Sequence, residues 1–288
     1  MLARQRQALI LARVREDGGV RVADLVRELG VSDMTVRRDL EVLHDRGLLE
    51  KVHGGATALA EGTLFEPGFK AKSALEESEK EAIAQAASAL VEAGSAVALS
   101  AGTTTYALAR RLVEVPRLTV VTNSVPVADV LHQAGRADQT IILTGGVRTP
   151  SDALVGPFAV SALRSIHVDL VFMGVHGMDE RSGFTTPNLL EAETNRALIE
   201  TGRRLVVVAD HTKWGVVGIS SIARLDEADI LISDPALPER AQELLRMTTR
   251  ELILVRVGER AAGESGRDGR PEGVRDSSAP TLVAAATR

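Results

Sequence analysis

The spacing of apolar residues changes along the chain and predicts two regions of different architecture. From residue 76 onward, short continuous apolar runs alternate with longer stretches in which apolar residues recur at helical spacing. The short runs are typical of strands buried on both faces, and the longer stretches are typical of helices with one apolar side. The predicted strands are residues 96–100, 118–122, 140–144, 169–174, 204–209, 229–233 and 251–257. The predicted helices are residues 80–93, 104–113, 125–134, 191–201 and 239–247.

Strands that alternate with helices of this length predict a largely parallel sheet. We therefore expect residues 76–258 to form a doubly wound α/β domain, in which ligands bind at the carboxyl ends of the strands. Residues 57–75 mix glycine and proline with isolated apolar residues, which indicates a linker. Residues 259–288 are rich in Gly, Arg, Glu, Ser and Ala, which predicts a disordered tail because such a segment cannot bury a core.

The first region, residues 1–56, has the pattern of a compact helical head. Two short helical stretches are followed by Gly30, a residue typical of a helix end, and then by Ser32, whose hydroxyl can cap a new helix. In this third helix, apolar residues at i, i+4 and i+7 form one buried stripe, so the polar side chains between them lie on the outer side. The stripe consists of Val36, Leu40 and Leu43.

After the third helix, Gly54 and Gly55 permit a tight chain reversal, which predicts a small β-wing. The order of helix, helix, turn, helix and wing is typical of a winged helix-turn-helix domain that binds double-stranded DNA. Adjacent arginines near the start of a recognition helix can reach phosphates and the acceptor edge of guanine. The predicted DNA-binding residues are Ser32, Thr35, Arg37, Arg38, Lys51 and His53. The alternative is a three-helix protein-interaction module with solvated arginines.

The composition and charge of the chain limit the classes of function that it can have. The chain contains no cysteine, which excludes disulfides, thiolate metal sites and thiol catalysis. A secretory signal pattern and an apolar run of membrane length are both missing, so we expect a cytoplasmic protein without a membrane partner. The net charge is −5, yet residues 1–56 hold ten basic and nine acidic residues and are marginally positive. Attraction to DNA must then come from local clustering and from a homo-oligomer, a dimer or tetramer, that presents several heads.

Four polar loops follow predicted strands of the second region. They are residues 100–105, 122–124, 144–146 and 210–213. Glycine permits close backbone approach, hydroxyls donate to phosphate, and a helix N-terminus favours an anion. Because parallel strands end at one edge of a sheet, these loops predict a pocket for an anionic ligand. His176 and His211 lack partners at metal-ligand spacing, so neither a metal nor a cofactor is expected.

The first region resembles the N-terminal signature of the DeoR family of bacterial transcriptional regulators, S-x-x-T-x-R-R-D-L followed by H-G-G-A. The second region resembles that family's effector domain, which is similar to ribose-phosphate isomerases, and the resemblance covers residues 4–257. It implies a phosphorylated sugar or related metabolite as effector, and repression of sugar-metabolism genes. The residues expected to bind effector are Ser100, Gly102, Thr103, Thr104, Thr105, Asn123, Ser124, Gly145, Gly146, Asp179, Glu191 and Lys213.

The chain departs from this pattern at two positions. Asn195 stands where the family often has a lysine, and His176 replaces the first carboxylate of the D-G-x-D-E segment found in the isomerases. An isomerase needs a carboxylate base, a role that Glu191 or Asp179 would have to fill. We expect binding without turnover, so no catalytic residue is assigned. A phosphosugar isomerase with an accessory DNA-binding module is the alternative, and a scaffold without DNA binding is a third class.

Overall fold

The computed structural model describes residues 2–17, 19–52, 54–57, 69 and 75–258. His53, most of the predicted linker and the predicted tail lie outside the described residues. Helix α8 and several short strands were not expected from the sequence, whereas each predicted strand and helix of the second region overlaps an observed one.

The head contains three helices and a small antiparallel sheet with strand order β1-β3-β2. Its elements are α1 (Ala3–Asp17), β1 (Gly19–Arg21), α2 (Val22–Leu29), α3 (Asp33–Asp45), β2 (Glu50–Val52) and β3 (Gly55–Thr57). The predicted stripe of α3 is buried against the other two helices in one apolar cluster. Gly55 is required where β3 crosses β1, because a Cβ atom there would lie 2.0 Å from the Val20 carbonyl oxygen. The wing therefore has three strands, one more than the chain reversal alone predicts.

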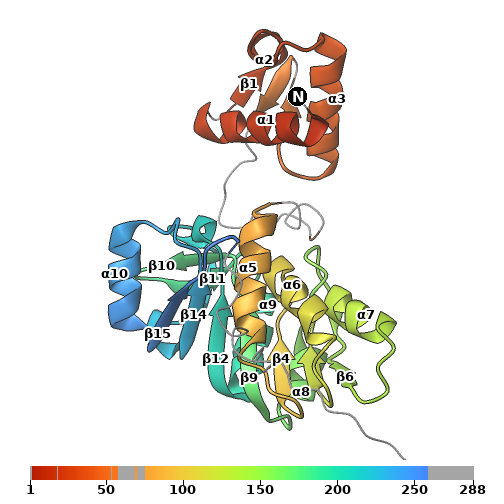
Figure 1. Cartoon of the computed structure of the whole chain (residues 1–288), viewed down its shortest axis with the longest axis vertical. Coiled ribbons are helices and arrows are strands. Elements are labelled where there is room, and N and C mark those ends of the chain that lie inside the picture. The colour runs from red at the N-terminus through yellow and green to blue at the C-terminus, as the bar shows by residue number, and fades with distance from the viewer. Residues whose placement is uncertain (1, 18, 53, 58–68, 70–74, 259–288) are drawn as a thin grey trace, which may run out of the picture.

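The second region is built on a seven-stranded sheet in which all neighbouring strands are parallel (Figure 1). The strand order is β15-β14-β12-β9-β4-β5-β6. The strands are β4 (Ala96–Leu99), β5 (Thr119–Thr122), β6 (Thr140–Leu143), β9 (Val168–Gly174), β12 (Gly202–Val208), β14 (Ile230–Ser233) and β15 (Glu251–Leu254). The sheet grows outward from β4 in both directions, with β5 and β6 on one side and β9, β12, β14 and β15 on the other, as in other doubly wound folds. The predicted fold class is confirmed.

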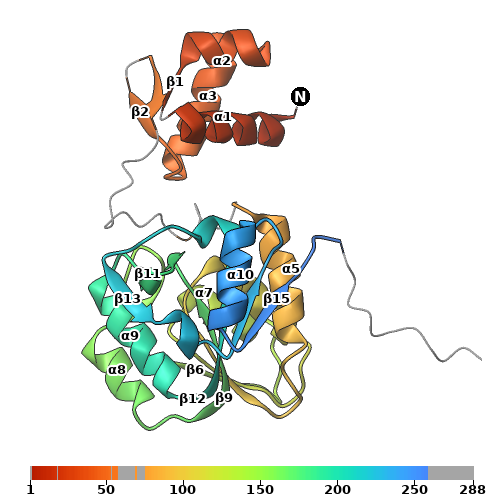
Figure 2. The same cartoon turned by 90° about the vertical axis from the view of Figure 1, so that its left-hand side faces the viewer.

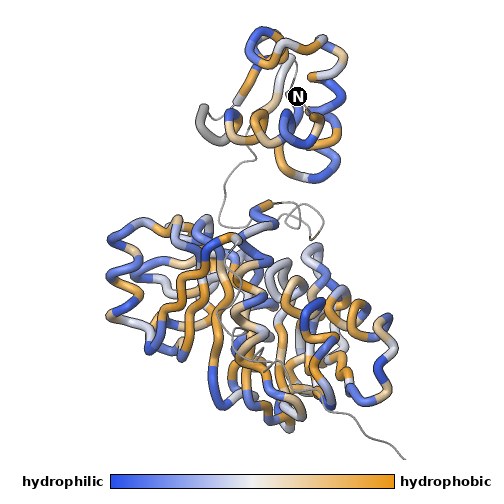
Figure 3. The backbone as a smooth tube through the Cα atoms, in the orientation of Figure 1, coloured by the Kyte–Doolittle hydropathy of each residue, from blue (hydrophilic) through white to orange (hydrophobic). Residues whose placement is uncertain are grey.

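Helices cover both faces of the sheet. In Figure 2, α8 and α9 lie on one side and α5 on the other. One apolar cluster joins the sheet to α5 (Glu77–Ser88), α6 (Thr103–Leu112) and α7 (Val125–Gln133). The other joins it to α8 (Pro157–Leu163), α9 (Leu189–Glu200) and α10 (Glu239–Thr248). Figure 3 shows hydrophobic residues concentrated along the central strands, as burial on two faces requires.

Short segments between the strands and helices of the main sheet form the remaining strands. The segments β10 (Gly177–Asp179), β11 (Gly183–Thr186) and β13 (Ser220–Ala223) form an antiparallel sheet, and β7 (Val147–Arg148) pairs with β8 (Leu154–Val155). Two 3-10 turns, η1 (His211–Lys213) and η2 (Leu225–Glu227), complete the described elements. No helix among the described residues is long and apolar enough to cross a membrane.

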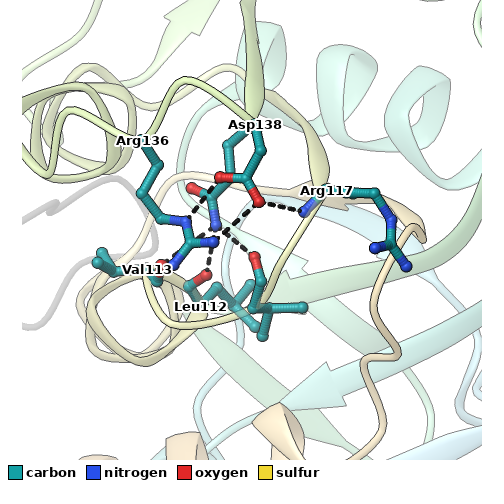
Figure 4. Close-up of polar contacts among 7 residues, drawn as sticks. Leu112, Val113, Arg117, Arg136 and Asp138 are labelled. Carbon is teal, nitrogen blue, oxygen red and sulfur yellow. Dashed lines mark hydrogen bonds and ion pairs between the residues drawn. The ribbon is translucent and has the colours of Figure 1, made fainter. Parts of the chain in front are cut away.

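A polar cluster closes the C-terminal end of α6, near the amino ends of β5 and β6 (Figure 4). The Gln139 amide nitrogen lies 3.0 Å from the Leu112 carbonyl oxygen and 2.6 Å from that of Val115, so it satisfies helix-end acceptors. The Asp138 carboxylate accepts from the Arg136 guanidinium and from the Arg117 backbone N–H. Those donors lower the pKa of Asp138 to about 2.

Candidate functional site

The outer side of α3 is the candidate DNA-binding surface. Ser32 caps the helix, because its hydroxyl accepts from the Thr35 N–H at 3.2 Å, and the two hydroxyls lie 2.8 Å apart. The Arg37 guanidinium is held by Asp33 one turn earlier, with Nε 2.5 Å from Oδ1. Arg38 is exposed, and its side chain has no hydrogen-bond or ion-pair partner within the described part of the chain.

Lys51 of β2 is the basic side chain of the wing that lies next to α3. Its Nζ is 3.0 Å from a Glu41 carboxylate oxygen. On this surface Arg38 has no partner among the described residues, Arg37 is fixed by a carboxylate, and Lys51 is shared with a glutamate. This modest positive charge matches the near balance of charges in the head sequence.

Asp39 holds the recognition helix in place, a role that the sequence pattern did not reveal. Its carboxylate is 4% exposed and accepts from Arg6 and Gln7 on α1. A buried carboxylate that receives two donors joins α1 to α3 and prevents the recognition helix from rotating freely. Asp39 is thus turned toward the interior of the head, although its neighbours Arg37 and Arg38 are exposed.

A pocket lies at the carboxyl ends of the central strands, where the sequence predicts it. Five of the predicted effector residues line it, namely Gly102, Thr103, Thr104, Glu191 and Lys213. Polar residues that sequence reasoning did not select also line it, namely Lys80, Ser151, His176, Thr186 and Asn195. His176 and Asn195, the two departures from the family pattern, therefore both lie in the pocket wall.

The N-terminal end of α6 is open to this pocket. Its N-cap residue, Gly102, has a φ of 155° and supplies no side-chain acceptor. By contrast, Ser124 caps α7 and Asn188 caps α9 through their side-chain oxygens. Uncapped amides and the helix dipole together favour an anion, so this end of α6 is suited to a phosphate group.

Three predicted residues support the α6 loop from behind instead of lining the pocket. Ser100 Oγ accepts from the Gly174 N–H at 2.9 Å, and Thr105 Oγ1 donates to the Gly102 carbonyl at 3.0 Å. Asn123 Oδ1 accepts from the Ala101 N–H at 2.9 Å, and its amide donates to Leu154. These bonds fix the loop backbone, which determines where the α6 amides point.

Four other predicted residues are not brought into the pocket. Ser124 is the α7 cap, and Gly145 and Gly146 form the turn before β7. A Cβ atom on Gly146 would lie 2.6 Å from the Val155 carbonyl oxygen, so close packing explains that glycine. The Asp179 carboxylate accepts from the N–H groups of residues 181 and 182, which lower its pKa and use it in a turn.

Glu191 enters the pocket from the first turn of α9. Its side chain is held by hydroxyls, because Oε1 accepts from Thr149 at 2.8 Å and from Ser151, and Oε2 accepts from Thr186 at 3.2 Å. The residue is 7% exposed. A carboxylate fixed by three donors is a rigid acceptor for ligand hydroxyls.

Two lysines give the pocket its positive charge. Lys213 belongs to η1, and Lys80 belongs to the first turn of α5. The positive charges of both lysines interact with the carboxylate of Asp210, which is fully buried. Burial alone would raise the pKa of Asp210, but Lys213, the hydrogen bonds from Thr212 and the charge of Lys80 outweigh it and lower the pKa. The sequence did not predict Lys80 as a pocket residue, because it lies at the start of a helix, far in sequence from every strand-end loop.

Among the described residues, no group of three His, Asp or Glu side chains is arranged to hold a metal ion. His211 is committed to a neighbouring loop, where its backbone N–H donates to Asp234 at 2.8 Å and its Nδ1 lies 2.9 Å from that carboxylate. The pocket combines two lysines and the uncapped amides of α6 with the fixed carboxylate of Glu191.

Both regions match family models. Residues 6–61 match the DeoR-like helix-turn-helix domain, and residues 75–235 match the DeoR C terminal sensor domain, which is more than half of the chain. The protein belongs to the DeoR family. This DeoR-family member is accordingly a DNA-binding transcriptional regulator with a head that binds DNA and a separate sensor domain.

Relatives of this DeoR-family regulator match over most of their length. The HTH-type transcriptional regulator GlpR of Haloferax volcanii is 38% identical over 245 residues, which cover 84% of this chain and 94% of GlpR. The transcriptional repressor AccR of Agrobacterium fabrum is 31% identical, over 80% and 88% of the two chains. A solved ribose 5-phosphate isomerase from Methanocaldococcus jannaschii has 17% identity and a TM-score of 0.34, over 47% of this chain and 53% of that one. A likeness at that level has no bearing on activity.

Proposed function

We propose that this regulator is a repressor of sugar-metabolism genes, and that a phosphorylated sugar bound in the sensor pocket releases it from operator DNA. The observation that supports this proposal is the uncapped N-terminus of α6 in the same pocket as Lys80, Lys213 and Glu191. The amides and lysines suit a phosphate, and Glu191 suits sugar hydroxyls. The name of AccR, a transcriptional repressor, supports the sign of regulation.

In this proposal six residues of the pocket have assigned roles. The phosphate binds at the first turn of α6, where Gly102 permits close approach and Thr103 and Thr104 supply hydroxyls. Lys213 neutralises its charge. Glu191, already held by three hydroxyls, accepts from the sugar, and Asn195 offers an amide.

The head acts as part of a homo-oligomer on double-stranded DNA in the cytoplasm. A single α3 offers few basic side chains, so two or more heads are needed for tight and specific binding. Arg37 and Arg38 contact base edges or phosphates, and Lys51 contacts phosphates. Ser32 and Thr35 set the start of the helix, through which they support the contacts of the two arginines.

The sensor binds its sugar without converting it. An isomerase needs a carboxylate base of tuned pKa beside a carbon-bound proton. Asp179 is used in a turn outside the pocket, and both oxygens of Glu191 already accept hydroxyl hydrogens. NMR of the protein incubated with ribose, fructose and tagatose phosphates is expected to show unchanged isomer ratios. Turnover that is abolished by Glu191→Gln would establish the isomerase alternative instead.

A thermal-shift screen followed by DNA titration tests the main proposal. A sugar phosphate that binds the native state at one hundred times its Kd adds about 2.7 kcal/mol of apparent stability. The same compound is expected to weaken binding to a duplex that the wild-type protein has selected from a random-sequence library. The unphosphorylated sugar is the matched control. Stabilisation by no sugar phosphate, or stabilisation without any change in DNA affinity, would contradict the proposal.

A further inference from the structure

Lys80 is a buried lysine that contacts both the effector pocket and the backbone of Leu75. Only 5% of the residue is exposed, and it lines the effector pocket. Its Nζ donates to the backbone carbonyl of Leu75 at 2.6 Å. The ammonium is therefore in contact with both the pocket and the backbone that directly precedes α5. Lysine is rarely buried, so this placement calls for an explanation.

Leu75 has two roles of its own. It lines the effector pocket, and its side chain also packs against the apolar cluster of the head. The residue that accepts the Lys80 hydrogen bond is thus in contact with both functional parts of the protein. A movement of Leu75 can therefore affect both the pocket and the head without any rearrangement of the sheet.

The backbone between Leu75 and Lys80 is strained. Glu76 has a φ of 46° and a ψ of 43°, the left-handed conformation that side chains other than glycine, asparagine and aspartate seldom adopt. It is the N-cap position of α5 and makes no capping bond with its side chain. The bond from Lys80 to the Leu75 carbonyl spans this strained residue and holds the chain in that conformation.

We propose that Lys80 transmits occupancy of the sensor pocket to the head by exchanging the Leu75 carbonyl for an anionic group of the effector. This rests on the proposed function, because it takes the effector to be an anion that changes DNA affinity. A phosphate oxygen is a stronger acceptor for an ammonium than a neutral carbonyl is. Once the ammonium turns to the phosphate, the Glu76 turn loses its tie, and Leu75 leaves the apolar cluster of the head.

The structure offers a second reason why the exchange is favourable. Lys80 and Lys213 share one buried carboxylate, Asp210, whose Oδ2 has no hydrogen-bond partner among the described residues. A dianionic phosphate beside these two ammonium groups is attracted by both charges. An unphosphorylated sugar carries no such charge and is not expected to move Lys80.

The test compares Lys80→Met, Lys80→Arg and wild type without any effector. Methionine keeps the length of the side chain but cannot donate, so Lys80→Met is expected to bind the selected duplex about tenfold more weakly, like the effector-bound protein. Arginine can still donate to the carbonyl and is expected to restore most of the affinity. Arg240→Met is the charge-matched control, since it removes one positive charge from the exposed side of α10, outside the pocket.

Amide hydrogen exchange provides the readout that a merely structural role would not give. Faster exchange confined to the start of α5, together with weak DNA binding in Lys80→Met, supports the proposal. Faster exchange throughout the sheet, or equal loss of DNA affinity in Lys80→Arg, would make Lys80 a packing residue and overturn it. Wild-type DNA affinity of Lys80→Met in the absence of effector would also overturn it. Because these comparisons need no effector, failure of every sugar phosphate to act on wild type would count against the proposed function alone.

Discussion

Arg37 and Arg38 are adjacent in sequence but differ in their surroundings. Asp33 holds the Arg37 guanidinium, whereas Arg38 projects from the helix without a partner among the described residues. An arginine fixed by a carboxylate is pre-oriented, which suits contact with a base edge, and a free arginine suits either a base or a phosphate. The sequence signature does not reveal this difference, because both residues are simply basic positions of one motif.

Replacement of either arginine by alanine is expected to weaken specific DNA binding by about 1–3 kcal/mol, if that arginine reads a base, and to leave folding intact. Gel-shift titration of the folded variants measures the effect. Arg27→Ala is the control, because Arg27 is exposed on α2 and pairs there with Asp24. Wild-type affinity in both variants would remove these residues from the DNA-binding surface.

Glu191 is a second residue whose local environment determines its expected behaviour. In Glu191→Gln the side chain gains an NH₂ group that faces hydroxyl donors and loses an acceptor, which is expected to cost about 1–3 kcal/mol of unfolding free energy. Urea unfolding measures this cost. Glu193→Gln, on the exposed side of the same helix, is expected to change stability little. Equal effects of the two substitutions would show that the hydroxyl cluster contributes no stability.

At the scale of an element, the N-terminus of α6 is the feature on which effector binding depends. Thr104→Asp adds a negative charge to its first turn and is expected to repel a phosphate while leaving DNA binding unchanged. Thr104→Asn has nearly the same shape without the charge, so it is the matched control. DNA release by effector is measured for both. A normal response in Thr104→Asp would mean that the phosphate binds elsewhere.

The opposite end of α6 gives a prediction about pH. The pKa of Asp138 is lowered to about 2 by Arg136 and Arg117, so its bonds stabilise the fold fully above the ordinary carboxyl pKa of about 4. Below that value the unfolded chain takes up the proton first, and the contribution declines until the pH reaches the folded pKa. Asp138→Asn is therefore expected to be less stable than wild type at neutral pH, and the difference is expected to shrink between about pH 4 and pH 2. Chemical unfolding at several pH values measures it, and a constant difference would contradict the assignment.

At the scale of the whole molecule, charge and symmetry determine how the protein must bind DNA. The chain carries a net charge of −5, and the head alone is only marginally positive. We expect two heads to occupy two half-sites about one helical turn apart. Footprinting and analytical ultracentrifugation of the complex test this expectation. A single chain bound to a single half-site with full affinity would contradict it.

The sequence alone determined the strands of the main sheet, most of the helices and the class of fold. Apolar runs identified all seven strands of the parallel sheet, and the capping serine and the stripe of α3 identified the recognition helix. These features are encoded locally, in residues within one or two turns of each other. The short strands β7, β8, β10 and β11, which lie outside the main sheet, show too little periodicity to be recognised, so the sequence did not predict them.

Only the tertiary structure decided which polar residues share the pocket. Strand-end loops were rightly expected near one another, but whether a side chain faces the pocket or supports its wall depends on neighbours distant in sequence. Ser100 bonds to Gly174, and Asn123 bonds to Leu154, so both are used as supports. Lys80 enters the pocket from a helix that precedes the first strand of the sheet. Local patterns record the fold's elements, whereas the direction of a side chain at a site is determined by packing between elements.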